Sequence, residues 1–362
     1  FKLVGAWELK SLIQPLGVMM IFAYFILSRN KGTMKLTQVD FALLAYFVFT
    51  LIPLFQNTDT LESIYIAIRE VFLLFILVIL FNQMALSQRQ WNWILLLVFT
   101  LVLANIFFTF LIYIIGLERY MILLTGEFFW GNHPEYKFKI SNYLGTKIYR
   151  VPALVGEAAA LRHFGVFSFF LLKTHKKYKY LAYLSLILVA CCFIRSVYVI
   201  LVLYYFILGF STNKRFARLV IYSLPLVPVG LFVMIKTNLL SLKSFMMRID
   251  FWQSKISVDY NFLLGGAIGS VGKASTTGGF EDTIDNYWLF LLFSIGILGI
   301  VLILLFLYEK TKNKKELIFI TIAVFFSGLF VTLTQSLVVL CFYPLLYMNY
   351  NNLKSNNGKF FN

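Results

Sequence analysis

Long apolar runs recur along the whole chain, and they constrain its fold more than any other feature of the sequence. Eleven such runs are separated by polar connections. A helix needs about 20 apolar residues to cross the hydrocarbon core of a bilayer. We therefore predict an all-α polytopic membrane protein. The predicted spans are 11–28, 40–55, 63–83, 92–116, 151–172, 178–193, 196–211, 218–236, 286–308, 317–334 and 336–350.

The composition excludes an ordinary soluble domain. Of the 362 residues, 60% are hydrophobic and 13% are charged, whereas soluble domains carry about 25% charged residues. The net charge of +16 would suggest nucleic-acid binding in a soluble protein. Here the lysines and arginines lie between apolar runs, as in membrane proteins, so we expect no nucleic-acid partner. No cysteine or histidine spacing indicates a metal site.

The charges of the connections assign each of them to one side of the membrane. Cytoplasmic loops are enriched in Lys and Arg, and the connection of residues 56–62 has neither, which places it outside. The assignment alternates through all eleven spans and puts the C-terminus in the cytoplasm. The odd number of spans suggests one further helix upstream of Phe1, giving twelve. The positively charged connections, predicted to be cytoplasmic, carry Arg29, Lys31, Lys35, Arg89, Lys173, Lys176, Lys177, Lys179, Lys214, Arg215, Arg218, Lys310, Lys312, Lys314 and Lys315.

Two connections are long, residues 117–150 and 237–285, and both fall on the predicted outer side. We expect residues 1–362 to form a single transmembrane domain with these two extracytoplasmic loops. Long loops are usually functional, and ionisable residues at the membrane are costly and therefore informative. The motifs in and after the loops are, in chain order, Arg150; Gly156-Glu157; Arg195-Ser196; Arg248 with Trp252; Gly265-Gly266 with Gly269; Asp285-Asn286-Tyr287; and Gly296 with Gly299.

This series of motifs resembles the O-antigen polymerase and O-antigen ligase superfamily of bacterial membrane glycosyltransferases. The resemblance covers about residues 150–299 and the general topology. It implies a GT-C-like helical fold in the bacterial inner (cytoplasmic) membrane, with no cofactor and no metal. It also implies a donor and an acceptor linked to polyprenyl pyrophosphate, and a flippase and a chain-length regulator as protein partners. Ligases typically carry His where this chain has Asp285, which favours a polymerase.

The chemistry of the matched residues suggests their roles. Guanidinium groups bind phosphate through paired donors and stay charged, so Arg150 and Arg248 are expected to grip the pyrophosphate and stabilise its developing charge. Glu157 or Asp285 would accept the proton of the attacking hydroxyl or hold the acceptor. These four are the catalytic candidates. The candidate substrate-binding residues are Arg69, Arg195, Trp252, Gly266, Asn286 and Tyr287.

Several of these residues also have a structural interpretation. Arginines at the membrane edge can act as anchors, and carboxylates at helix starts can act as caps. Arg69 can pair with the adjacent Glu70 or with Glu62 instead of binding phosphate. We expect His163, which follows Arg162 inside a span, to be a hydrogen-bonded interior residue.

The sequence thus predicts a polymerase that joins lipid-linked oligosaccharide repeat units into a surface polysaccharide at the outer face of the membrane. A ligase-type glycan transferase is the first alternative, because it shares the pyrophosphate chemistry. A polysaccharide transporter or flippase is the second. Transporters bind near the midplane between internal repeats, whereas here no clear repeat is present and the notable polar residues gather at the outer edge.

Overall fold

The computed structural model describes most of the helical part of the chain. The described residues are 36–57, 61–84, 86–117, 119–120, 139–143, 146–149, 151, 153–154, 158–192, 195–223, 246, 249–250, 252–253, 261–266, 286–331 and 333–357. They are mostly helical, with one two-stranded antiparallel hairpin. The elements are α2 (Gln38–Asn57), α3 (Leu61–Val71), α4 (Leu73–Gln83), α5 (Gln88–Ile115), β1 (Lys139–Tyr143), β2 (Thr146–Tyr149), α8 (Ala158–Lys173), the 3₁₀ helix η1 (Leu181–Leu184), α9 (Ser185–Cys192), α10 (Arg195–Thr212), α11 (Lys214–Ser223), α14 (Tyr287–Thr311), α15 (Lys315–Ser327), the 3₁₀ helix η4 (Leu333–Gln335) and α16 (Leu337–Asn357).

The predicted membrane character is confirmed at a coarse level. Among the described helices, α5 and α14 are long and apolar enough to cross a membrane. The helices α3 and α4, which meet at a break, would make a third span if they cross together. The number of eleven spans and the GT-C-like arrangement stay predictions, and the predicted span 11–28 lies outside the described residues.

Two predicted spans differ from the helices that the structure contains. The predicted span 63–83 is divided by Phe72 into α3 and α4. The predicted span 151–172 begins late, because α8 starts only at Ala158. Ala153 has a φ of 45°, a left-handed conformation that a helix cannot contain.

Helix α5 shows why its sequence favours a long helix with one buried face. It begins with a capping box, in which the Ser87 hydroxyl accepts from the Gln90 N–H at 3.3 Å and the Gln90 side chain accepts from the Ser87 N–H at 2.9 Å. It ends at Ile115 and is followed by the C-cap Gly116, whose φ of 86° suits glycine. Its buried residues recur every three or four positions, while its other faces expose large apolar side chains, as expected beside lipid rather than water. These include Trp93, Leu97, Phe107, Phe110 and Ile114.

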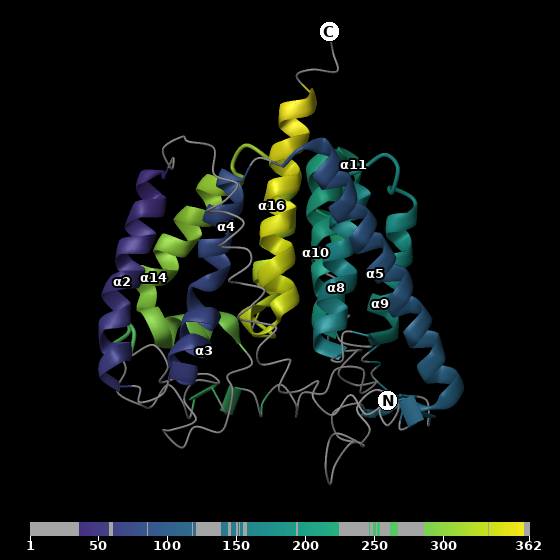
Figure 1. The fold of residues 1–362 in the computed structure, drawn as a ribbon, viewed down its shortest axis with the longest axis horizontal. Helices are drawn as coiled ribbons and strands as arrows, with labels where there is room; N and C mark the ends of the chain where they lie inside the picture. The colour runs from purple at the N-terminus through teal and green to yellow at the C-terminus, as the bar shows by residue number, and fades with distance from the viewer. Residues whose placement is uncertain are drawn as a thin grey trace. The chain divides into compact units, whose positions relative to one another are not determined.

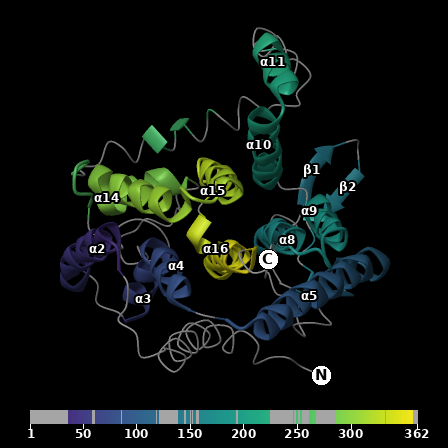
Figure 2. The same ribbon diagram turned by 90° about the horizontal axis from the view of Figure 1, so that it is seen from above.

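The chain divides into two compact units. The first comprises Phe1–Thr37, Phe72–Tyr198 and Thr334–Asn362, and the second comprises Gln38–Val71 and Val199–Leu333. In the first unit α8 packs against α5, α9 and α16, and α16 also packs against α4 (Figure 2). Every residue from 161 to 172 is buried, as expected for a helix enclosed on all sides.

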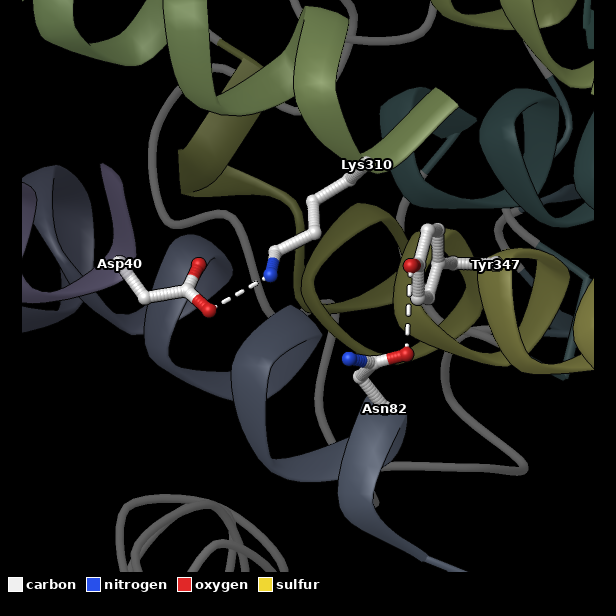
Figure 3. Close-up of polar contacts among 4 residues, drawn as sticks. All are labelled: Asp40, Asn82, Lys310 and Tyr347. Carbon is white, nitrogen blue, oxygen red and sulfur yellow. Dashed lines mark hydrogen bonds and ion pairs between the residues drawn. The ribbon is translucent and has the colours of Figure 1, made fainter. Parts of the chain in front are cut away.

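Close packing and a few polar contacts hold the first unit together. A Cβ atom on Gly165 of α8 would lie 2.9 Å from the side chain of Val189 on α9, so the absence of a side chain permits this close approach. The Tyr347 hydroxyl of α16 donates to Asn82 Oδ1 of α4 at 3.2 Å (Figure 3). The first contact joins neighbouring helices of the chain, whereas the second joins residues that are 265 positions apart.

In the second unit α2 lies beside α14, and α15 also packs on α14 (Figures 1 and 2). Near the start of α2, Asp40 accepts a hydrogen bond from Lys310 in the last turn of α14 at 2.6 Å (Figure 3). The two side chains are 0% and 5% exposed, respectively. The sequence analysis placed Lys310 in the connection after the predicted span 286–308, whereas α14 extends to Thr311 and buries it.

The ion pair between Asp40 and Lys310 gives a test of what fixes α2 against α14. We expect Asp40→Leu or Lys310→Met alone to lower the free energy of unfolding by about 3–5 kcal/mol, because each leaves a buried charge unpaired. The double replacement should be close to the original protein. Unfolding would be followed by circular dichroism in detergent micelles, with Lys312→Met at an exposed position as the control. A double variant as unstable as the single variants would contradict this role.

Candidate functional site

The candidate site residues are only partly covered by the described residues. The four catalytic candidates, Arg150, Glu157, Arg248 and Asp285, all lie outside them, as does the side chain of Arg195 at the start of α10. The convergence of Arg150 and Arg248 therefore stays a prediction. The five remaining candidates are described. The chain directly after two of the catalytic candidates, Arg150 and Asp285, is described as well. The described residues contain no group of three or more His, Cys, Asp or Glu side chains that could hold a metal ion.

The start of α14 is anchored by its own sequence. Asn286 is the N-cap, and its Oδ1 accepts from the N–H groups of Trp288 at 3.0 Å and Leu289 at 3.1 Å. The Tyr287 N–H donates to the carbonyl of Gly328, just beyond α15, at 2.7 Å. The Trp288 indole donates to the carbonyl of Phe325 at 2.8 Å. Asp285 thus directly precedes a fixed helix start.

These contacts show a capping role for Asn286 and a packing role for Tyr287. The Tyr287 ring is fully buried and stacks on Phe290 with the ring centroids 6.3 Å apart. Direct contact of either residue with substrate stays a prediction. The structural explanation was available from sequence, since Asn is a preferred N-cap residue before an apolar run.

A break in α14 is the most specific feature of the second unit. Gly296 has φ 65° and ψ −176°, which interrupts the helix and frees backbone groups in its middle. The segment Asn261–Gly266, from the predicted second outer loop, docks at this break and pairs with the freed groups. Backbone groups at membrane depth must be paired within the protein. The hydrogen bonds run from the Ile297 N–H to the Phe262 carbonyl (2.9 Å), from the Leu298 N–H to the Leu263 carbonyl (3.2 Å) and from the Gly266 N–H to the Phe293 carbonyl (2.6 Å).

Local sequence shapes the docking segment. The side-chain oxygen of Asn261 accepts from the N–H groups of Leu263 and Leu264 at 3.0 and 3.1 Å, which folds the segment into a turn. Gly265 then adopts a φ of 85°, a conformation that glycine reaches without strain. A Cβ atom on Gly265 would lie 2.6 Å from the backbone nitrogen of Gly296, and one on Gly296 would overlap the backbone of Gly265. The two glycine motifs of the sequence thus meet where Gly265 crosses Gly296, and neither glycine can be given a side chain at this crossing.

Tyr46 of α2 fastens this crossing, and sequence reasoning missed it. Its hydroxyl lies 2.6 Å from the carbonyl of Ile295 and 3.3 Å from the carbonyl of Leu264. The shorter distance marks Ile295 as the main acceptor. One side chain therefore contacts both the broken helix and the docked segment. The only signal in the sequence was a hydroxyl in the middle of an apolar run.

Gly266 and Trp252 belong to the same predicted outer loop. Gly266 uses its N–H in the docking contacts. Trp252 is half-buried, and its indole nitrogen has no hydrogen-bond partner among the described parts of the chain. The unused indole N–H could donate a hydrogen bond to a ligand, but the binding role of Trp252 stays a prediction.

Arg69 and Glu70 form a local pair on α3. The closest oxygen and nitrogen are 3.8 Å apart, and the side chains are 11% and 0% exposed. The sequence left open whether Arg69 pairs with Glu70 or binds phosphate. The pairing is confirmed as an ion pair, and the phosphate contact stays a prediction. A buried carboxylate needs such a neighbouring cation.

In the first unit, the chain that follows Arg150 is held against α5. The carbonyl of Ala153 accepts from the Tyr120 hydroxyl at 2.8 Å, and the Leu154 N–H donates to Asn105 Oδ1 at 3.1 Å. Burial raises the pKa of Tyr120 to about 12, so its hydroxyl keeps its proton at working pH. Arg150 is thus the residue just before a buried, anchored turn that begins at Val151.

The same unit buries Arg162 and His163 in α8, with 6% and 1% of their surfaces exposed. The expected interior position of His163 is confirmed. The expected hydrogen bond is not present, because neither ring nitrogen has a partner among the described residues.

Comparisons of this chain with protein-family models, with curated proteins and with solved structures found no match. The functional proposal therefore depends on the motifs and on the described geometry.

The crossing of Gly265 and Gly296 can be tested by adding single methyl groups. We expect Gly296→Ala to lower the free energy of unfolding by about 1–2 kcal/mol for the left-handed conformation, with about 1–3 kcal/mol more for the overlap. Gly116→Ala is the matched control, since Gly116 also has positive φ but no atom within 4 Å of its added Cβ. Thermal unfolding in micelles measures both variants. Equal losses of stability in Gly296→Ala and Gly116→Ala would show that the contact between Gly265 and Gly296 contributes nothing.

The role of Tyr46 is tested by removing only its hydroxyl. We expect Tyr46→Phe to cost about 1–3 kcal/mol of stability, because a buried carbonyl loses its partner. Hydrogen exchange of residues 261–266 should also become faster. Tyr308→Phe is the control, since Tyr308 lies on α14 and is 66% exposed. An unchanged rate of hydrogen exchange in residues 261–266 of Tyr46→Phe would show that Tyr46 does not hold this segment on α14.

Proposed function

We propose that the chain is an integral-membrane glycosyltransferase that polymerises oligosaccharide repeat units carried on polyprenyl pyrophosphate. The acceptor hydroxyl attacks the anomeric carbon of the donor, the bond from that carbon to pyrophosphate breaks, and a glycosidic bond forms. The hydroxyl proton passes to a carboxylate, Glu157 or Asp285. Arg150 and Arg248 bind the pyrophosphate and balance the charge that it gains as it leaves.

The docking of segment Asn261–Gly266 on broken α14 is the observation that best supports this proposal. It joins two motifs that the family resemblance selected separately. Arg248 precedes the docked segment by 13 residues and Asp285 follows it by 19 residues. Asp285 is also adjacent in the chain to the Asn286 cap. Reactive groups need such rigid support to act on a bound substrate.

The anchored turn after Arg150 supports the proposal in the same way. Val151 and Ala153 are fully buried, and two side chains from the α5 region hold this turn. An arginine that precedes it has a short tether, which lowers the entropy lost when the arginine orders around a phosphate.

Replacement of the two arginines tests the proposal. We expect Arg150→Ala and Arg248→Ala each to reduce polymerisation about 100-fold or more, as does the loss of one charge-stabilising donor elsewhere. Replacement of Arg150 or Arg248 by Lys should restore little of the polymerisation activity, because an ammonium group cannot make the paired contact with phosphate. Polymer length would be measured by gel electrophoresis of glycans from cells, with Arg215→Ala at an exposed position of α11 as the control.

The result that would refute the proposal is long polymer of normal length from correctly inserted Arg150→Ala and Arg248→Ala proteins. Deletion of the gene separates the sibling activities. Loss of long chains with single units retained indicates a polymerase, whereas accumulation of lipid-linked polymer indicates a ligase.

A transporter or flippase is the second candidate, and the break in α14 is the observation that favours it. Transporters commonly bind their substrates at interrupted helices. Here the freed groups at the break are used by the docked segment, which favours a structural role. Vesicles containing the purified protein distinguish the two, since a transporter moves a fluorescent lipid-linked sugar across the bilayer without joining units.

A further inference from the structure

We propose that His163, together with Arg162, is a further contact for phosphate oxygens of the lipid-linked substrate, inside the first unit. This inference deepens the proposed function and rests on it. It concerns a buried pair on α8 that the mechanism above does not use.

His163 carries hydrogen-bonding capacity that the protein does not satisfy. A neutral imidazole has one N–H donor and one nitrogen acceptor. Both nitrogens of His163 are buried and without a partner among the residues that the structure describes. The helix around it is enclosed, since residues 161–172 are all buried. Buried polar groups without partners are rare in native proteins, and they often mark a functional role.

Arg162 determines the charge of the ligand that this place would accept. It is adjacent to His163, only 6% exposed, and within electrostatic reach of Cys192 at the end of α9. Arg162 has interactions of its own in the structure, whereas His163 is the residue whose hydrogen bonds are unmet. A fixed positive charge beside an imidazole N–H favours an anionic oxygen. Phosphate is the anion that the proposed substrate supplies.

The position of the pair along α8 matches an approach from the predicted outer side. His163 follows Ala158, the first residue of α8, by five positions, which is about 7 Å of helix. Thr109 on α5 and Thr334 before α16 are also fully buried with unpartnered hydroxyls. Thr109 lies near the end of α5 that the sequence places outside, and Thr334 lies in η4, just before the end of α16 that the sequence places outside. Both α5 and α16 pack on α8. Polar groups thus gather at one end of this unit.

Binding of inorganic pyrophosphate to the purified full-length chain tests this inference. The protein would be placed in phosphatidylcholine nanodiscs, and its melting temperature measured as pyrophosphate is added. We expect pyrophosphate to raise the melting temperature of the original protein. In His163→Leu we expect at least tenfold weaker binding together with an unchanged or higher melting temperature in the absence of pyrophosphate, because two unpaired buried nitrogens are removed.

Two further variants keep the test decisive. His163→Gln retains a donor and should keep part of the response if His163→Leu fails to fold. Ser168→Ala is the matched control, since Ser168 is also a buried, unpartnered residue of α8 but lies five positions deeper. Its pyrophosphate response should equal that of the original protein. An undiminished response in His163→Leu, or no response in the original protein, would overturn the inference.

Two comparisons identify the source of the phosphate and distinguish a failure of this inference from a failure of the proposed function. A His163-dependent rise in melting temperature that occurs only in phosphatidylglycerol nanodiscs, without any response to pyrophosphate, would assign the site to a lipid headgroup and overturn the inference. Normal polymer in cells from His163→Leu, with polymer lost in Arg150→Ala, would refute this inference alone. Polymer retained in Arg150→Ala and Arg248→Ala, with His163-dependent pyrophosphate binding intact, would refute the polymerase instead.

Discussion

The pairing of backbone groups at the break in α14 is the constraint on which the second unit depends. Lipid offers no hydrogen bonds, so a helix interrupted at Gly296 can exist only if another part of the chain supplies them. Segment Asn261–Gly266 does so, and it brings with it a piece of the predicted second outer loop. Within the predicted loop, this contact therefore fixes residues 261–266 beside α14.

Buried charged and polar groups are accommodated in three different ways. Asp40 and Lys310 neutralise each other at hydrogen-bonding distance, and this pair connects α2 to α14. Arg69 and Glu70 are sequence neighbours whose charges are close but whose contact is longer. His163 differs from both, because its nitrogens are enclosed without a partner among the described residues. The first arrangement suits a fixed structural contact, whereas the third suits a group that acquires its partner on binding.

Sequence predicted the helical class and many helix positions, because apolar length and charged connections report on the bilayer directly. The ends of α5, α10 and α14 lie within a few residues of the predicted limits. The break at Phe72 and the late start of α8 were not predicted. Both depend on backbone conformations that an apolar run does not encode, such as the positive φ of Ala153.

The candidate site was predicted as separate motifs rather than as contacts. The glycines at 265 and 296 were singled out from the sequence, but their meeting is a tertiary contact that spacing alone cannot give. Tyr46 was missed because its partners are backbone carbonyls about 220 and 250 positions away, which leave no pattern near Tyr46 itself. Lys310 was predicted to lie in a connection because it precedes a cluster of lysines, and its partner Asp40 is distant in the sequence.

That distance has a consequence for the biogenesis of the protein. Asp40 and Lys310 are separated by 270 residues, and a ribosome adds roughly 5–20 residues per second. Asp40 is therefore synthesised on the order of ten seconds or more before Lys310. Until then we expect α2 to stay where water can hydrate the carboxylate of Asp40 or where the carboxylate can be protonated. Helix α14, which is synthesised late, thus completes the packing of α2, which is synthesised early.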